Sequence, residues 1–161
     1  VNASSEQLEK ECFVEDTLAI LKEYDFPPSQ LWIEITERCR DLPISMIKKT
    51  VTAFREAGIH ITMDDYGTGS SSSQMMLELP VEGIKIDMFF VKDILEEKKK
   101  QALVIGMINF ANAADLKICI EGIENDNLES YLRQFDVTCF QGYHYSRSIC
   151  QDELMKLLIK P

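Results

Sequence analysis

Two adjacent carboxylates end a largely apolar run near the middle of the chain. Asp64 and Asp65 follow residues 59–63 (IHITM), and a glycine–serine segment, residues 67–73, comes shortly after them. Neighbouring carboxylates repel each other unless a cation, a proton or hydrogen bonds compensate their charge. The pair either caps the following loop through backbone N–H groups or holds divalent cations. The glycines suit a tight turn as well as the close approach of a ligand.

Three further charged residues occupy similar places in other apolar runs. Glu34 lies within LWIEI, Lys85 stands between two isoleucines in GIKID, and Glu121 follows KICI. Hard oxygen ligands such as these carboxylates suit Mg²⁺ or Mn²⁺. Lys85 either forms a salt bridge with one of the acids, or it orients or deprotonates water or balances phosphate charge. The joint pattern favours two metal ions bridged by carboxylates, an arrangement that serves phosphoryl chemistry.

These residues belong to a repeating alternation of strand and helix. We expect strands at 31–35, 59–63, 83–87, 117–120 and 138–141, and helices at 4–24, 43–57, 72–79, about 96–116, 127–135 and 152–159. Strands separated by helices of this length pair in parallel through right-handed crossovers. Polar residues at the carboxyl ends of successive strands fit a (β/α) barrel, which builds its active site at that face. A doubly wound sheet would gather them at one switch point.

Composition describes one soluble globular domain. The 161 residues are 45% hydrophobic and 27% charged, and the net charge of −10 argues against a partner that is a nucleic-acid polymer or a membrane surface. No apolar stretch is long enough for a membrane span. The five cysteines are odd in number and lack CxxC spacing, which indicates reduced, mostly buried thiols in a cytoplasmic protein. The two histidines, His60 and His144, give little support for zinc and are expected to be structural or exposed.

Several motifs in chain order resemble those of a known family. They are VNAS at the start, IEITE (33–37), DDYGTGSSS (64–72), LPVEGIKID (79–87), EGIE (121–124) and QGYHYSR (141–147). The set resembles the successive motifs of EAL domains, bacterial phosphodiesterases that hydrolyse cyclic di-GMP. The resemblance covers nearly the whole chain, and it implies a TIM-type barrel with a site for two Mg²⁺ or Mn²⁺ ions.

The resemblance also implies metal ligands. Asn2, Glu34 and Asp64 match metal ligands of the family, while Asp65 and Glu121 match residues that serve the second metal and its water. On this basis a metal-activated water attacks one phosphodiester bond of cyclic di-GMP and releases the linear dinucleotide.

Three other residues match family positions. Lys85 matches the lysine that contacts the attacking water, and Glu37 matches the glutamate that holds the loop after the aspartate pair. Gln141 matches a glutamine near the substrate at the last strand.

The resemblance begins at the asparagine strand, so we expect an incomplete barrel. The first two strands, with the Glu-Ala-Leu motif, are missing from residues 1–161, and a complete barrel takes at least about 200 residues. We therefore expect weak or absent phosphodiesterase activity from this truncated EAL domain alone, and a homodimer that covers its open strand edges. The alternatives are a non-catalytic module that binds cyclic di-GMP or a protein, and a purely structural fragment.

Overall fold

Six parallel strands form one open sheet. The computed structural model describes residues 1–36, 39, 42–69 and 72–159, and in that part of the chain the strand order is β1-β2-β3-β4-β5-β6. The strands are β1 (Asn2–Ala3), β2 (Trp32–Thr36), β3 (His60–Tyr66), β4 (Gly83–Ile86), β5 (Lys117–Ile120) and β6 (Cys139–Phe140). Every neighbouring pair is parallel, as the helical connections predict.

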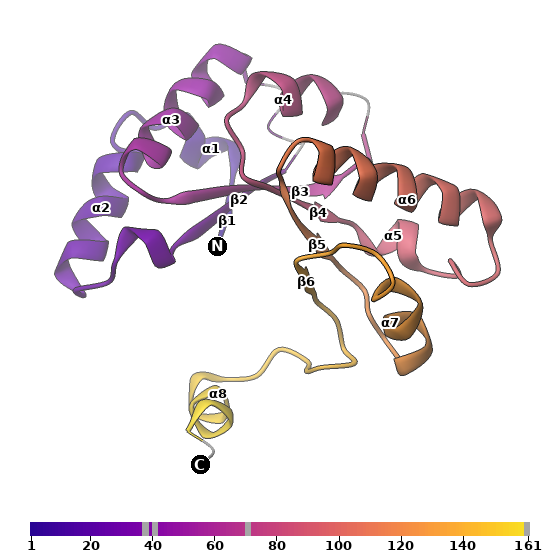
Figure 1. The fold of residues 1–161 in the computed structure, drawn as a ribbon. Coiled ribbons are helices and arrows are strands. Elements are labelled where there is room, and N and C mark those ends of the chain that lie inside the picture. The colour runs from indigo at the N-terminus through magenta and orange to yellow at the C-terminus, as the bar shows by residue number, and fades with distance from the viewer. Residues whose placement is uncertain (37–38, 40–41, 70–71, 160–161) are drawn as a thin grey trace.

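Helices follow the strands and cover one face of the sheet. They are α1 (Ser5–Leu8), α2 (Phe13–Glu23), α3 (Ile44–Glu56), α4 (Ser72–Glu78), α5 (Met88–Val91), α6 (Lys98–Ala113), α7 (Asp126–Leu132) and α8 (Gln151–Leu158), with a short 3₁₀ turn at Pro28–Gln30. Figure 1 shows α2, α3, α4, α6 and α7 as an arc around the sheet, with α8 apart at the end of an extended segment. The sheet is open between β1 and β6. None of the described helices has both the length and the apolar character that crossing a membrane requires.

The predicted helix at 4–24 is two helices. The capping box of Ser4 and Gln7 is confirmed, but the first helix ends at Leu8 and a second helix begins at Phe13. The turn lets Leu8 enter the core while α2 sets the ring of Phe13 edge-on against Phe54 of α3, with 5.1 Å between ring centroids. The spacing of apolar residues predicts one continuous helix here. It carries no information on where α3 packs, and the break between α1 and α2 depends on that packing.

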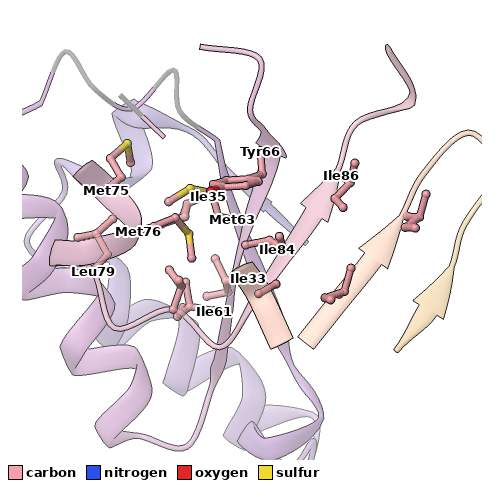
Figure 2. Close-up of a cluster of buried hydrophobic side chains, with 14 of the residues drawn as sticks. Ile33, Ile35, Ile61, Met63, Tyr66, Met75, Met76, Leu79, Ile84 and Ile86 are labelled. Atoms are coloured by element: carbon pink, nitrogen blue, oxygen red, sulfur yellow. The ribbon is translucent and has the colours of Figure 1, made fainter. Parts of the chain in front are cut away.

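The two faces of the sheet differ in chemistry. Figure 2 shows isoleucines of β2, β3 and β4 packed with Met75, Met76 and Leu79 from the segment that contains α4. Ile33 and Ile35 are 3% and 0% exposed, and Glu34 between them points to the opposite face, since successive side chains of a strand alternate. Hydrophobic burial therefore fixes the strands from the helical side and leaves the other face for polar residues.

Strand β3 does not end at the aspartate pair, as predicted, but continues through both residues to Tyr66. Met63 pairs with Ile84 and Tyr66 with Ile86, so the register shifts between them. Asp65 has a φ of 55°, a left-handed conformation that aspartate adopts more readily than most residues. In a regular strand, Asp64 and Asp65 would point to opposite faces of the sheet. The irregularity therefore matters for the site, because it changes where these two side chains point.

Candidate metal centre

Lys85 occupies the middle of a carboxylate cluster on the polar face. Its Nζ lies 2.7 Å from Oε1 of Glu121, 3.1 Å from Oε2 of Glu34 and 3.1 Å from Oδ1 of Asp64. The residue is 6% exposed. Burial favours the neutral amine, but the hydrogen bonds to Glu121 and Glu34 and the charge of Asp64 together raise the pKa of Lys85. The lysine therefore stays an ammonium at neutral pH.

Asp64, Asp65 and Glu121 form the second half of the cluster. One ligand oxygen from each lies within 4.8 Å of the others. The bulge in β3 explains how both aspartates reach the same end of the sheet. Asp64 Oδ1 is buried and accepts no hydrogen bond, because its 3.1 Å contact with Lys85 is an ion pair without hydrogen-bond geometry. A buried carboxylate oxygen in this state is one that a cation would satisfy.

Glu121 stands directly after β5, and its backbone N–H donates to the carbonyl of Ile86 at 3.0 Å. Burial raises the pKa of its carboxyl group, while the contact with Lys85 opposes that change. Gly122 follows with a φ of 76°, and a Cβ there would lie 2.5 Å from the Cβ of Met88. Glycine thus allows α5 to approach closely beneath Glu121.

Two predicted residues lie at the edges of the sheet. Asn2 pairs in register with Glu34 on β2, so it belongs to the same face and is exposed to solvent. Gln141 follows β6, and its N–H donates to the carbonyl of Ile120 at 2.9 Å. Glu37, predicted to hold the loop after the aspartate pair, lies outside the described residues.

A cavity of about 370 Å³ on the polar face joins Gln141 to the cluster. It is lined by side chains from both ends of the strands, among them Trp32, Glu34, Lys85, Lys117, Cys119 and Gln141. A larger cavity of about 640 Å³ lies beside α1 and α3 and contains no residue of the cluster. Cavity volume therefore does not identify the functional site in this protein. The cluster of partly buried charged side chains identifies it.

The oxygen donors fit a hard divalent cation. Three carboxylates, from Glu34, Asp64 and Glu121, contact the ammonium of Lys85, so negative charge exceeds positive charge among these four described side chains. Mg²⁺ and Mn²⁺ prefer such oxygen ligands. Together with the buried Oδ1 of Asp64, which accepts no hydrogen bond, this excess makes the cluster a candidate metal centre.

The histidines lie outside the cluster. His60 stacks on Trp32 and contacts Glu82 through Nδ1 at 2.9 Å, and His144 Nε2 lies 3.0 Å from Glu129. A carboxylate thus neighbours each ring, which agrees with the structural role expected for both.

The prediction of mostly buried cysteines is wrong. Of the five, Cys39 is buried, Cys119 is half-buried, and Cys12, Cys139 and Cys150 are exposed. Cys119 and Cys139 line the same cavity as Lys85. Neither cysteine was predicted at the site, although the alternation of β5 places Cys119 on the same face as Glu121. Cys139 is exposed because β6 is an edge strand.

Comparison with known proteins adds to this geometry. Residues 1–148 match the EAL domain family model. The chain is 28% identical over 147 residues to the cyclic di-GMP phosphodiesterase PdeR of Escherichia coli. The aligned region covers 91% of this chain and 22% of PdeR. The chain spans about a fifth to a quarter of the length of three curated relatives that it matches, PdeR among them.

Two solved structures are similar. The EAL domain of Mycobacterium smegmatis DcpA superposes with a TM-score of 0.93 at 31% identity, over 98% of this chain and 70% of that one. A manganese and cyclic di-GMP complex of Klebsiella pneumoniae BlrP1 superposes with a TM-score of 0.82 at 25% identity, over 89% of this chain and 37% of BlrP1. These likenesses confirm the predicted TIM-type arrangement of parallel strands, here in an open sheet.

Proposed function

The chain belongs to the EAL domain family, and from that premise we propose that it hydrolyses cyclic di-GMP to linear pGpG in bacterial second-messenger signalling. The observation that carries this proposal is the ammonium of Lys85 held among Glu34, Asp64 and Glu121 at one end of a parallel sheet. The relative PdeR is a cyclic di-GMP phosphodiesterase, which supports the same substrate. Because the proposed substrate is an intracellular second messenger, we place the protein in the cytoplasm.

The proposed cofactor is Mg²⁺ or Mn²⁺ at two positions. Residues that would hold the ions are Asn2, Glu34, Asp64, Asp65 and Glu121, all on the polar face or at the end of its strands. Bound metal would supply a water of lowered pKa and would stabilise charge on the phosphoryl oxygens. The manganese complex of BlrP1 and the unsatisfied oxygen of Asp64 support this assignment.

The chain's own groups divide the remaining work. Lys85 stays protonated, so its Nζ donates hydrogen bonds to the attacking water and does not act as a base. The carboxylate of Glu121, 2.7 Å from Lys85 Nζ, is positioned to accept a proton from that water. Gln141, at the far side of the cavity, would donate from its side-chain amide to the substrate and orient it.

Solvent access to the cluster limits the proposed activity. The polar face is open between β1 and β6, and Asn2 is exposed at one edge. A substrate bound at this open face would keep much of its contact with water, which weakens its own electrostatic contacts and leaves it poorly fixed. We therefore propose that residues 1–161 alone turn over slowly.

We also propose that two copies pair to cover the open strand edges and the exposed apolar residues of α8, such as Leu154 and Leu158. Light scattering over a range of protein concentrations tests this, and a monomer at every concentration would contradict it.

The test of function is product analysis after incubation of the purified chain with cyclic di-GMP and Mn²⁺ or Mg²⁺. Metal-dependent formation of pGpG that disappears in Asp64→Asn and in Lys85→Met supports hydrolysis. Binding of cyclic di-GMP without product would support the non-catalytic binding module instead. Absence of both would leave only the structural alternative.

A further inference from the structure

Two cysteines extend the row of side chains that contains Lys85. Lys85 pairs in register with Cys119 on β5, and Cys119 pairs in register with Cys139 on β6. Residues paired in this way on parallel strands project from the same face of the sheet. Both cysteines line the cavity that also contains Glu34 and Lys85.

The spacing of this pair suits a covalent bond. Neighbouring strands lie about 4.8 Å apart, and disulfide-bonded cysteines have Cα atoms about 4.4–6.8 Å apart. Cys139 is exposed and Cys119 is half-buried, so a small oxidant reaches the pair from the cavity. Among the strand pairings of the described residues, this is the only one that matches cysteine with cysteine.

We propose that Cys119 and Cys139 form a redox modification site, which a hydroperoxide converts to an intramolecular disulfide. The sulfur of the exposed Cys139 attacks one peroxide oxygen, the O–O bond breaks, and a sulfenic acid and an alcohol or water result. The sulfur of Cys119 then attacks the Cys139 sulfur, the S–O bond breaks, and water leaves. Overall the two thiols lose two protons and two electrons, and the peroxide accepts them. A thiol reductant reverses the reaction.

The disulfide would fix the edge of the metal centre. Strand β6 has two residues and pairs with β5 alone among the described strands. A covalent bond at Cys139 would hold β6 to the sheet and keep Gln141, two positions further on, at the cavity. The site does not depend on the proposed phosphodiesterase activity, because it needs only the register of β5 and β6 and an oxidant.

The experiment oxidises the full chain with a small molar excess of hydrogen peroxide and maps its cysteines by mass spectrometry without reduction. We expect two of the five thiols to be lost, a Cys119–Cys139 linked peptide more abundant than all other pairings combined, and recovery of five thiols with dithiothreitol. Cys119→Ser and Cys139→Ser should abolish the linked peptide, whereas the matched control Cys150→Ser, at another exposed cysteine, should not.

Chain oxidised in urea serves as the second control, because unfolding removes the register. It should give mixed pairings. The proposal is overturned if folded wild-type protein pairs Cys139 mainly with Cys150 or with another molecule. It is also overturned if Cys139 becomes a stable sulfenic or sulfinic acid while Cys119 stays a thiol.

Discussion

Replacing Lys85 with methionine removes the ammonium from between Glu34, Asp64 and Glu121 and keeps much of the side chain's length. The side chains of Glu34, Asp64 and Glu121 are only 23%, 13% and 17% exposed, respectively. Without the ammonium, the three carboxylates would therefore repel each other with little screening by solvent. Removing one partner of a buried ion pair destabilises a protein by about 3–5 kcal/mol, and the residual exposure places this case near 3 kcal/mol. For a chain of this size that corresponds to a fall in Tm of about 6–12 °C.

The loss of stability should depend on pH. In the wild type Lys85 has a raised pKa, so its contribution is present below its ordinary value of 10.5, where the neighbouring carboxylates are ionised, and is lost as pH rises above that value. Glu121 also has a raised pKa, and its contribution is lost as pH rises from its ordinary value of 4.5 through the folded value. Without Lys85 the pKa of Glu121 rises further, so the gap in stability between wild type and variant should widen as pH rises above 4.5, by roughly 1.4 kcal/mol for each unit of added shift.

Urea unfolding followed by circular dichroism across this pH range measures both effects. Lys117→Met is the matched control, because Lys117 lies on the neighbouring strand, with its Nζ 4.6 Å from the ring centroid of Trp32. Losing that cation–π contact should reduce stability by no more than about 1 kcal/mol, independently of pH. Equal losses in the two variants, or a gap that does not change with pH, would refute the role given to Lys85.

Three other substitutions test separate parts of the structure. Asp64→Asn should leave the fold intact and lower Mn²⁺ affinity by at least about tenfold, measured by calorimetry; unchanged affinity would exclude this oxygen as a ligand. Asp65→Val should destabilise the protein by about 1–2 kcal/mol more than Asp65→Gly does in urea unfolding, because φ at this position is 55°; equal effects would contradict the strained bulge. Gly142→Ala should reduce stability by about 1–3 kcal/mol, since the new Cβ would lie 2.0 Å from the carbonyl oxygen of Ile123; a neutral result would mean that the turn moves freely.

Local patterns predicted much of the fold because they depend on side-chain alternation within one segment. The strand at 117–120 was predicted with its observed bounds, and Glu34 and Lys85 were each placed on a strand between two isoleucines that are buried. The meeting of these residues at one end also followed from the sequence, because parallel strands bring their carboxyl ends together.

Features that depend on neighbouring segments were not predictable in this way. The bulge at Asp65 arises from the register of β3 against β4, and the break after Leu8 arises from the place of α3. The pairing of Cys119 with Cys139 requires knowing that β6 lies next to β5. Glu37 remains a prediction, since it lies outside the described residues.

Crystals soaked with Mn²⁺ and measured near the manganese absorption edge would test most directly whether the cluster is a metal centre. We predict an anomalous peak at about 2 Å from Asp64 Oδ1, the distance of direct coordination, within reach of Asp65 and Glu121. Asp64→Asn should weaken or remove that peak. Manganese bound instead at the separate group of Asp126, Glu129 and His144, or no ordered manganese at all, would contradict the assignment.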